Sequence, residues 1–584
     1  MSVTTAGLAP APTEHLLDDV RLAVLTRGGT ADWRLHGDVL EIGAHEELEI
    51  RLSVPLGDAV GFWHPACDWQ RTLVADWAGY QRISLVHGAA AGCLYDSRGR
   101  TLLAFAAEDA VPEVSMRFGV SEESKTFVVH LSVPAGPYRI HFARSAPTVA
   151  TAMRALRRAL GEGATEPAEG AREPVYSTWY GFTQDVSAEG VEEEAALAAA
   201  AGCGVLILDD GWQEFGNGRG YGGVGDWVPD SQKFPDFAEH VARVRALGLR
   251  YLVWVAPLLL GPGAACFDEL EPHAPASAGV PGARVLDPRR PEVRRHVVAL
   301  CARLMELGID GLKIDFLDQA MVYAGRPAHG ADIHDLGTAM RVLLAEVRQA
   351  VGERALLEFR QPYVGPGMAG LADLLRADDC PADATANRVR TIDIALLAVA
   401  GTVHGDMLMW DPRAGAHSAA RQLIGSLHAV PQISARLAGL PEEQRRMVAF
   451  WLGEWRRLRH VLLDGEVEPG RPDELYPVVK AARGDECVIT VSAERVVPVD
   501  SAAYRSITLV NGTGAGRLVL EVSGPGADVA RLHGADGSRI EPVVRRLEAG
   551  LVSLAVPASG LVVLDAPGPP VSSVSGVAGL EEER

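Results

Sequence analysis

Residues 204–212 read GVLILDDGW and residues 308–316 read GIDGLKIDF, and these two stretches decide the fold. Each is a short apolar run that begins after a glycine and ends in a carboxylate, as expected of a buried strand that enters a polar loop. Similar runs recur between about 175 and 460. The expected strands are Val175–Tyr180, Val205–Asp210, Tyr251–Ala256, Gly311–Phe316, Leu356–Arg360, Leu374–Asp379, Thr402–Met407 and Gln432–Arg436.

Helical patterns separate these runs, for example at Ala188–Ala201, Pro291–Leu307, Ile333–Val351 and Ser418–His428. Eight strand–helix repeats over roughly 285 residues predict a (β/α)8 TIM barrel across residues 170–462, since such barrels take about 250 residues. The alternative is a doubly wound open sheet, which normally carries a glycine-rich phosphate loop after its first strand. Here Tyr180-Gly181-Phe182-Thr183 supplies no such loop, so the barrel is favoured.

The flanking regions have a different pattern. Residues 1–165 contain short alternating segments separated by Gly, Asp and Pro turns, which predicts an N-terminal β-sandwich that ends in a helix near 150–161. Short β-like runs return in 463–568 and predict a small C-terminal antiparallel β-sandwich. A polar linker is expected at 162–174, and the tail at 569–584 is expected to be disordered.

Composition excludes several classes of function. The 584 residues carry 55 basic and 76 acidic side chains, a formal net charge of −21, which repels nucleic acid and anionic membrane surfaces. No stretch of about 20 apolar residues is present to cross a bilayer, and the N-terminus lacks the pattern of a secretory signal. The seven cysteines are scattered without CxxC spacing, which argues against a disulfide framework. We therefore expect a cytoplasmic protein.

The chemistry is expected at the C-terminal ends of the barrel strands, because the βα loops meet there. Carboxylates, basic groups and indoles occupy these ends: Trp179, Asp209, Asp210, Trp212, Trp254, Lys313, Asp315, Glu358, Arg360, Arg376, Asp378, Asp379, Asp406 and Trp410. Charged groups bind sugar hydroxyls and indoles stack on the C–H faces of sugars. Paired carboxylates, one ionised and one protonated, cleave glycosidic bonds. The set therefore predicts a small carbohydrate as substrate.

Three motifs carry a family resemblance: Asp209-Asp210-Gly211-Trp212, then Gly225-Asp226-Trp227 with Lys233-Phe234-Pro235, then Lys313-x-Asp315. In this order and spacing the chain resembles glycoside hydrolase family 36, the melibiase group of α-galactosidases. The resemblance is close over about 170–320 and looser to about 460. The layout of sandwich, barrel and small C-terminal sandwich is also similar to that family. It implies a retaining α-glycosidase, most readily an α-galactosidase.

The resemblance implies that Asp315 is the nucleophile. Lys313, two residues earlier on the same strand face, is expected to keep Asp315 ionised and to contact a sugar hydroxyl. It also implies an acid/base on the sixth strand, where Asp379 is favoured and Asp378 replaces the usual Ser. Because adjacent carboxylates raise each other's pKa, either of these two could carry the proton. In a retaining enzyme the two catalytic carboxyl groups stand about 5–5.5 Å apart.

The family likeness also assigns sugar-binding groups. Asp209 and Asp210 match an acidic pair that holds the C4 and C6 hydroxyls, which requires that the strand has ended and the chain turns at Gly211. Trp254 matches a Trp near the sugar pocket. Trp212 and Trp179 are candidates to complete the wall of that pocket, with packing in the barrel core as the alternative for each indole.

Arg360 and Arg376 are the basic candidates for binding the sugar. Arg360 is expected to clamp a hydroxyl, and the alternative is an ion pair with Glu358 or Asp378. On the N-terminal domain, Trp63 and Trp69 lie in the aromatic stretch GFWHPACDWQRTLVADW. This stretch either reaches over the barrel mouth and floors the pocket or packs in the sandwich core and the domain interface.

The chain departs from the family pattern at two places. Lys313-Ile314-Asp315-Phe316-Leu317 stands where the family has Lys-Trp-Asp-Met-Asn. The family segment Cys-x-Ser-Gly-Gly-Gly-Arg is replaced by Glu358-Phe359-Arg360-Gln361-Pro362-Tyr363. Because both changes fall on the sugar pocket, N-acetylgalactosamine or an arabinopyranose stays open beside galactose.

Other functions stay open as well. The same site could transfer the sugar to a sugar acceptor, as in a transglycosidase, or a barrel could bind sugar without catalysis. No cofactor is required, and a metal site finds little support, because the histidines are scattered and no HxH motif stands on the first strand. No nucleic acid or membrane partner is expected. The family relationship leaves a homo-oligomer open.

Overall fold

The computed structural model describes residues 13–26, 31–161, 168–218 and 220–568. The chain forms two compact units. The first comprises the chain to Arg456 together with Glu468–Pro477, and the second comprises Arg457–Val467 and the chain from Val478. The tail predicted to be disordered, 569–584, lies outside the described residues, as does part of the expected linker.

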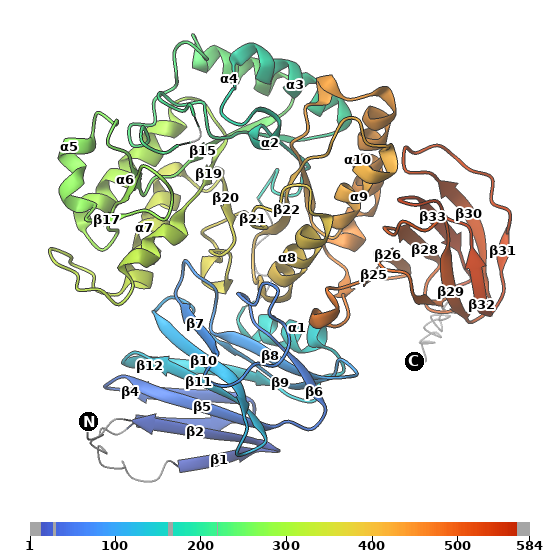
Figure 1. The fold of residues 1–584 in the computed structure, drawn as a ribbon, viewed down its shortest axis with the longest axis horizontal. Helices are drawn as coiled ribbons and strands as arrows, with labels where there is room; N and C mark the ends of the chain where they lie inside the picture. The colour runs from blue at the N-terminus through green and yellow to red at the C-terminus, as the bar shows by residue number, and fades with distance from the viewer. Residues whose placement is uncertain (1–12, 27–30, 162–167, 219, 569–584) are drawn as a thin grey trace, which may run out of the picture. The chain divides into compact units, whose positions relative to one another are not determined.

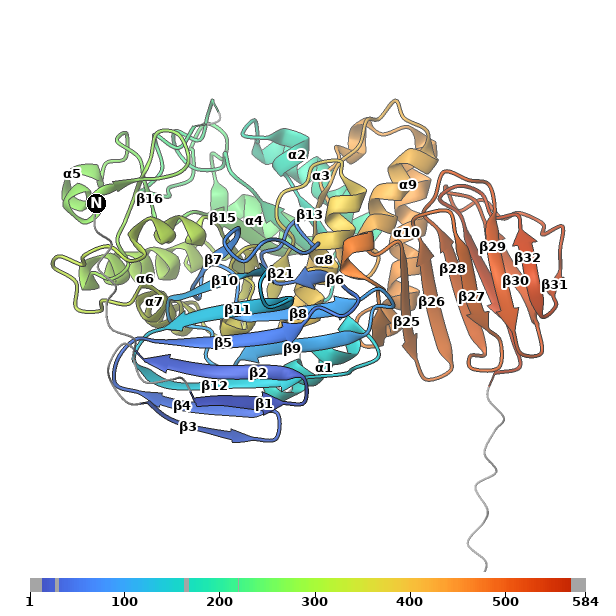
Figure 2. The same ribbon diagram turned by 60° about the horizontal axis from the view of Figure 1, so that its bottom comes forward.

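The N-terminal region is a sandwich of two antiparallel six-stranded sheets. The first sheet has the order β1 (Thr13–Leu17), β2 (Val20–Thr26), β5 (Leu48–Pro55), β11 (Thr126–Val133), β10 (Val114–Ser121), β7 (Gly79–Ile83). The second has the order β3 (Ala31–His36), β4 (Val39–Ala44), β12 (Gly136–Ala143), β9 (Thr101–Ala107), β8 (Ala91–Asp96), β6 (Ala59–Trp63). The strands of both sheets run across the view in Figure 2.

Alternation builds the core of this sandwich. In β5, Leu48, Ile50, Leu52 and Val54 are buried, and the residues between them are partly exposed. One face of the strand therefore packs against the other sheet and the other face meets solvent. The helix α1 (Val149–Ala159) follows the sandwich, close to the span predicted for it.

The second part of the first unit is the predicted barrel. Eight parallel strands close on themselves in the order β13 (Val175–Ser177), β14 (Val205–Leu208), β15 (Arg250–Val255), β19 (Gly311–Ile314), β20 (Leu356–Arg360), β21 (Leu374–Arg376), β22 (Thr402–Leu408), β23 (Val430–Ile433). All eight predicted strands are present, and the prediction of a TIM barrel is confirmed. The open sheet is excluded because β13 pairs with both β14 and β23.

Helices surround these strands in Figure 1. They are α2 (Trp179–Phe182), α3 (Ala188–Ala201), α4 (Phe237–Ala246), α5 (Phe267–Leu270), α6 (Pro291–Met305), α7 (Leu336–Val351), α8 (Ala384–Leu397), α9 (Ala416–Gly425) and α10 (Glu442–Leu462). A small sheet of β16 (Leu259–Leu260), β18 (Arg284–Val285) and β17 (Ala276–Ser277) extends one loop. Single-turn 3-10 segments lie at Glu271–His273, Pro366–Met368, Leu437–Gly439 and Pro472–Glu474, and a longer one lies at Leu317–Tyr323.

Local signals fix where these helices begin and end. Ser187 caps α3 by accepting a hydrogen bond from the Gly190 N–H, and Gly202 ends it in the left-handed region at φ +110°. Several ends of the predicted strands were wrong by one to three residues, for example the end of the sixth strand, which stops at Arg376 and not at Asp379. The first strand stops at Ser177, so Trp179 begins the short helix α2, and the eighth runs from Val430 to Ile433.

A buried polar cluster joins the sandwich to the barrel. Asp393 on α8 accepts hydrogen bonds from Trp63 Nε1 at 2.9 Å and Tyr476 OH at 2.7 Å, and it pairs with Arg71 at 2.5 Å. Trp63 is fully buried and Trp69 is half exposed. The interface interpretation of the aromatic stretch is therefore correct for Trp63, whose indole anchors the sandwich to α8.

The second unit is a β-sandwich of mixed rather than purely antiparallel sheets. Its larger sheet has the order β24 (Glu466–Glu468), β25 (Val478–Arg483), β26 (Glu486–Val491), β28 (Ser506–Asn511), β33 (Leu561–Asp565), β30 (Ala527–His533), β31 (Arg546–Leu547). The smaller has β27 (Val496–Asp500), β29 (Leu518–Ser523), β32 (Gly550–Leu554). Most pairs are antiparallel, but β26 with β28 and β27 with β29 are parallel. Among the described residues, no helix combines the length and the apolar composition needed to cross a bilayer.

Candidate active site

Asp315 stands at the centre of the barrel rim, one residue beyond the end of β19. The chain turns there, because Phe316 is in the left-handed region at φ +59° and its N–H donates to Asp315 Oδ1 at 2.7 Å. This turn lifts the carboxylate off the strand and points it at the mouth of the barrel. Asp315 is 8% exposed, so it is enclosed but not sealed off.

Three side chains hold the Asp315 carboxylate. Trp254 Nε1 donates to Oδ2 at 3.0 Å, and Arg360 Nε and Tyr363 OH donate to Oδ1 at 2.6 and 3.2 Å. Burial alone would raise the pKa of Asp315, but the charges of Arg360 and then Lys313 outweigh it and hold the pKa well below its usual range. Asp315 is therefore a permanently ionised carboxylate, the state that a nucleophile needs.

Lys313 makes a different contact from the one expected. Its Nζ donates to Asp209 Oδ2 at 2.6 Å, so the ion pair of Lys313 is with Asp209 and not with Asp315. The strand ends at Ile314, and Asp315 turns away from the face on which Lys313 lies. Lys313 acts on Asp315 only as the second of its cations, after Arg360.

Asp209 and Asp210 follow the end of β14 at Leu208, and the chain turns there. This turn is the condition under which both side chains could bind the sugar. Gly211 has φ +111°, and a Cβ there would lie 2.5 Å from Gln184 Cα, so only glycine fits. Asp210 accepts from Gln184 Nε2 and Gln213 Nε2, both at 2.7 Å. Burial raises the pKa of Asp210 to about 6, because these amides carry no charge to offset it.

Arg360 is not a free hydroxyl clamp. Besides Asp315 it pairs with Asp378 through Nη1 at 3.1 Å and with Asp318 through Nη2 at 3.5 Å. The alternative of an ion pair with Asp378 is correct, and that with Glu358 is wrong. The guanidinium also lies over the ring of Phe316, 5.3 Å from its centroid. Arg360 is a positioning residue that ties the nucleophile to the loop after β21.

Arg376 lies below the rim and is fully buried. The prediction that it contacts the sugar is therefore wrong. Its Nη1 lies 2.5 Å from Asp406 Oδ1 and 3.0 Å from Asp379 Oδ1, and its Nε lies 3.4 Å from Glu358 Oε1. Asp406 also accepts from Cys380 N and Tyr180 OH. One guanidinium therefore serves three carboxylates on neighbouring strands.

Asp379 is the carboxylate on this side of the rim that faces solvent, with a side chain 52% exposed. Burial acts to raise its pKa, but Arg376 lowers it below the usual value. The sequence suggested that the neighbouring carboxylate of Asp378 would raise the pKa of Asp379, but the pKa of Asp379 is lowered. Asp315 acts on Asp379 electrostatically, so the two predicted catalytic groups lie within range of each other. Asp378 instead turns toward Arg360.

The three indoles predicted at the sugar pocket lie in different surroundings. Trp212 is fully buried and donates to the Trp254 carbonyl at 2.9 Å, which is the core-packing alternative. Trp254 is 2% exposed and its N–H is used by Asp315. Trp179 lies on α2 and is partly exposed.

A protein-family model described as melibiase matches residues 165–345, which cover the barrel from before β13 into α7. Over these residues the chain is similar to the melibiase family. This confirms the family resemblance on which the roles of Asp209, Asp210 and Asp315 were based.

Curated relatives match part of the chain. α-Galactosidase C of Emericella nidulans is 27% identical over 150 residues, which is 23% of this chain and 20% of the relative. An α-galactosidase of Escherichia coli is 32% identical over 96 residues, 16% of this chain and 13% of the relative. The match thus spans a fifth or less of these two relatives.

Solved structures show that the likeness of fold extends over most of the chain. The GH36 α-galactosidase AgaA from Geobacillus stearothermophilus superposes with a TM-score of 0.61 at 15% identity, over 95% of this chain and 84% of that one. TtGalA from Thermus thermophilus, solved in complex with p-nitrophenyl α-D-galactopyranoside, gives a TM-score of 0.56 at 18% identity, over 81% and 98%.

The site contains two residues that sequence reasoning missed. Tyr363 lies in the segment that replaces the family's glycine-rich motif and donates to Asp315. Tyr221 packs edge-on to Phe316 at 5.2 Å, and burial followed by the charges of Asp210 and Asp315 raises its pKa. The glycine-rich loop GNGRGYGGVG around Tyr221 was the available signal, since a lone aromatic among glycines marks a functional loop.

His404, on β22, is used within the barrel core. It is fully buried, its Nε2 lies 2.8 Å from the Ala171 carbonyl, and burial lowers its pKa to about 4. Among the described residues, no group of three or more His, Cys, Asp or Glu side chains is arranged to hold a metal ion. Asp209, Asp210 and Asp315 are bound to cations and amides of the protein itself.

Proposed function

We propose that this protein is a retaining α-glycosidase that releases terminal α-linked galactose, with Asp315 as nucleophile and Asp379 as acid/base. One observation carries the proposal: an ionised Asp315, held by Trp254, Arg360 and Tyr363, lies close enough to the solvent-exposed Asp379 to act on its charge. Two such carboxyl groups are the equipment of glycosidic bond cleavage. The family match and the named α-galactosidases among its relatives support galactose as the sugar.

In the first step, Asp315 Oδ attacks the anomeric carbon while Asp379 gives its proton to the departing glycosidic oxygen. The C–O bond to the leaving group breaks as the bond to Asp315 forms, which leaves a covalent glycosyl-enzyme. Three donors fix the Asp315 carboxylate, so little reorganisation precedes the attack. Developing positive charge on the sugar is stabilised by the ionised acids around it.

In the second step, Asp379 takes a proton from water, and this water attacks the anomeric carbon and releases Asp315. The lowered pKa of Asp379 suits this base role. For the first step it must carry a proton, so the lowered pKa favours an acidic optimum. A bound sugar that excludes water from Asp379 raises its pKa toward neutrality. Arg376 lowers the pKa of Asp379 and the bound substrate raises it. The balance of these two effects decides whether Asp379 acts as the acid or as the base.

Asp209, Asp210 and Lys313 are the groups proposed to bind the hydroxyls of the sugar. The Lys313–Asp209 pair offers both donors and acceptors in one place. Asp210 has a pKa of about 6, so near neutral pH it can accept from a hydroxyl when ionised and donate to one when protonated. The strands that precede or carry these residues, β14 and β19, both pair with β15, which supports a shared role near the nucleophile.

The decisive test measures turnover of aryl α-galactosides by the purified protein and by Asp315→Asn. We expect the substitution to lower kcat by more than about 10⁴-fold, because removing a covalent nucleophile removes the reaction path. Asp411→Asn, the same change at an exposed rim aspartate paired with Arg413, is the control. Near-normal turnover by Asp315→Asn would refute the assignment of the nucleophile.

The identity of the sugar and of the acceptor needs separate measurements. A panel of aryl α-galactosides, N-acetylgalactosaminides and arabinopyranosides identifies the sugar, and galactose is expected to be preferred. Product analysis with and without a sugar acceptor distinguishes hydrolysis from transfer, and free galactose of retained anomeric configuration is expected. Release of no sugar from any member of the panel would contradict the proposal.

We further propose that the protein works in a reducing compartment such as the cytoplasm. The proposal is supported by the seven cysteines, which are all free thiols and of which six are buried. Cell fractionation tests it, and recovery in a secreted fraction would overturn it. A homo-oligomer remains a prediction that light scattering of the purified protein checks.

A further inference from the structure

Tyr221 lies on the loop that joins β14 to α4, and its ring packs against residues that adjoin the nucleophile. It meets Phe316 edge-on with ring centroids 5.2 Å apart, and its centroid lies 6.4 Å from that of Trp254. Trp227, on the same loop, packs edge-on to Trp254 at 5.4 Å. These four rings form an aromatic wall beside Asp315. Trp227 and Trp254 are buried, whereas Tyr221 and Phe316 are partly exposed, so a substrate can touch these two.

Backbone contacts fix the position of Tyr221. Its N–H donates to the Pro281 carbonyl at 3.3 Å, and the Gly263 N–H donates to the Gly222 carbonyl at 2.7 Å. Gly261 approaches the same loop so closely that a Cβ there would lie 2.5 Å from the Tyr221 carbonyl oxygen, so only glycine fits. The side chain of Tyr221 is therefore presented from a backbone that its neighbours hold in place.

The hydroxyl of Tyr221 has no hydrogen-bond partner among the described residues, although it lies near the acids of the site. Burial raises its pKa, and the charges of four carboxylates raise it further, in the order Asp210, Asp315, Asp209 and Asp379. The phenol therefore stays neutral, and its O–H can donate. A hydroxyl within electrostatic range of four carboxylates that bonds to none of them faces the space that they share.

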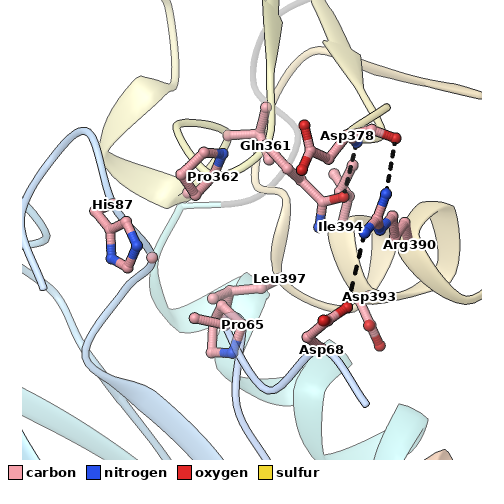
Figure 3. A pocket seen from close by; sticks show the side chains of 14 residues that line it. Pro65, Asp68, His87, Gln361, Pro362, Asp378, Arg390, Asp393, Ile394 and Leu397 are labelled. Atoms are coloured by element: carbon pink, nitrogen blue, oxygen red, sulfur yellow. Dashed lines mark hydrogen bonds and ion pairs between the residues drawn. The ribbon is translucent and has the colours of Figure 1, made fainter. Parts of the chain in front are cut away.

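The sugar to be cleaved lies in this shared space. Its anomeric carbon has to meet both Asp315 and Asp379. The cavity where the sandwich meets the barrel (Figure 3) is excluded as its place, because Asp378 and Gln361 line that cavity and the two catalytic acids do not. With the anomeric carbon at Asp315, the far end of the pyranose lies toward Asp210, which follows β14 on the other side of β15.

The C6 group is the part of galactose that suits Tyr221. Asp210 is the strongest charge on the Tyr221 hydroxyl, so this hydroxyl lies toward the end of the sugar away from the reacting carbon. In galactopyranose, C6 is a methylene outside the ring that carries its own hydroxyl. A methylene packs on an aromatic ring, and its hydroxyl can accept a hydrogen bond from a phenol. The hydroxyls borne directly on the ring lack that methylene.

We propose that Tyr221 is a specificity-determining residue that selects galactose by its C6 group. The rings of Tyr221 and Phe316 contact the C6 methylene, and the Tyr221 hydroxyl donates to the C6 hydroxyl. The inference rests on the proposed α-glycosidase function and names the feature of the substrate that this chain recognises. It decides between galactose and an arabinopyranose, because an arabinopyranose has no C6.

The test compares three aryl glycosides that differ only at C6, with the full-length protein. The α-D-galactoside carries CH₂OH at C5, the α-D-fucoside carries a methyl group, and the β-L-arabinopyranoside carries hydrogen. Tyr221→Phe removes the hydroxyl and keeps the ring. We expect its kcat/KM for the galactoside to fall about fivefold to tenfold, the value of one hydrogen bond, and its kcat/KM for the other two to stay within about twofold.

Tyr221→Leu removes the ring as well. Its kcat/KM should fall at least about tenfold for the galactoside and the fucoside, which both place a carbon against the wall, and by less than about threefold for the arabinopyranoside. Tyr80→Phe, the same change as Tyr221→Phe at an exposed tyrosine on β7, is the control and should change none of the three. Inhibition constants of the three free sugars give the same comparison where an analogue is turned over too slowly.

Equal losses on the three substrates with Tyr221→Phe, or no loss on the galactoside, would overturn the role of Tyr221. An unmodified protein that prefers the arabinopyranoside would overturn selection by C6. Should the unmodified protein hydrolyse none of the three, the proposed function itself fails. Thermal unfolding of each variant identifies a folding defect, and Tyr221→Phe keeps the test decisive if Tyr221→Leu does not fold.

Discussion

The two sides of the barrel rim hold their catalytic carboxylates in opposite ways. On the side of β15, β19 and β20, Asp315 is enclosed by Trp254, Arg360 and Tyr363, and each donates a hydrogen bond to it. On the side of β21 and β22, Asp379 has one side-chain partner, Arg376, and is half exposed. The first carboxylate is fixed in place and in charge, and the second can exchange protons with water.

This difference follows from what each group has to do. A nucleophile acts as the anion throughout, so several donors and a nearby cation serve it. An acid/base has to change its protonation in every cycle, and many donors would prevent that. Arg376 divides its charge between Asp379 and Asp406, and burial holds the pKa of Asp406 at about 6. The sharing keeps Asp379 from being as strongly ionised as Asp315.

Asp379→Ala is expected to lower turnover most, and this loss distinguishes Asp379 from Asp378, the other acid of the loop after β21. Without a proton donor, turnover of substrates with poor leaving groups should fall by about 10²–10⁴-fold. α-Galactosyl fluoride needs no protonation of its leaving group, so its first step should be nearly unchanged. Single-turnover kinetics on both substrates measure this. Asp378→Asn is the comparison and should lower turnover by less than about tenfold. A larger loss with Asp378→Asn than with Asp379→Ala would make Asp378 the acid.

On the nucleophile side, Arg360→Met removes the strongest cation near Asp315. Burial then dominates and raises the pKa of Asp315, so the acid limb of kcat/KM should move to higher pH. We expect kcat to fall by about 10²-fold, because the carboxylate also loses its positioning donor. A pH–rate profile checks both effects. An unmoved acid limb would mean that Lys313 alone keeps Asp315 ionised.

Asp406→Asn is expected to shift the alkaline limb of the pH profile of kcat/KM. Ionised Asp406 raises the pKa of Asp379 and competes for Arg376, so its neutralisation should lower the pKa of Asp379 further. The alkaline limb of kcat/KM, which reports loss of the acid proton, should therefore move to lower pH. The pH profile of Asp406→Asn tests this, together with thermal unfolding, since Cys380 N and Tyr180 OH also bind Asp406. A shift to higher pH would contradict the shared-cation interpretation.

The fold was predictable because the eight barrel strands are short apolar runs with a clear end. The span of α3 was also predictable, since Ser187 and Gly202 mark its two ends. The helix α8 was missed. Its sequence ATANRVRTIDIALL lacks a single apolar stripe because Asp393 and Thr391 are buried too, where the helix meets the sandwich. Helices buried on more than one side give no simple periodicity.

The ion pairs of the site were less predictable than its residues. Spacing along one strand suggested that Lys313 serves Asp315, but its partner Asp209 lies 104 positions away, just after β14. Which carboxylate a long cationic side chain reaches depends on the curvature of the closed sheet, and one strand does not contain that information. The same holds for Arg360, whose three acidic partners come from the ends of two other strands.

The smallest and cleanest effect is expected from Tyr363→Phe, which removes one hydroxyl from the cage around Asp315 and keeps the ring. The hydroxyl lies 3.2 Å from Asp315 Oδ1 and 3.1 Å from the Ile314 carbonyl. Three of the four hydrogen bonds to Asp315 remain, so kcat should fall only about threefold to tenfold, the value of one hydrogen bond to a charged group in a partly redundant set.

The acid limb of kcat/KM for Tyr363→Phe should rise slightly, and by less than in Arg360→Met, because a neutral donor stabilises the anion less than a guanidinium does. A pH–rate profile of the two variants side by side measures this order. A loss for Tyr363→Phe as large as that for Arg360→Met would mean that geometry, and not charge, governs the nucleophile. The contrast between the two sides of the rim would then rest on the placement of donors alone.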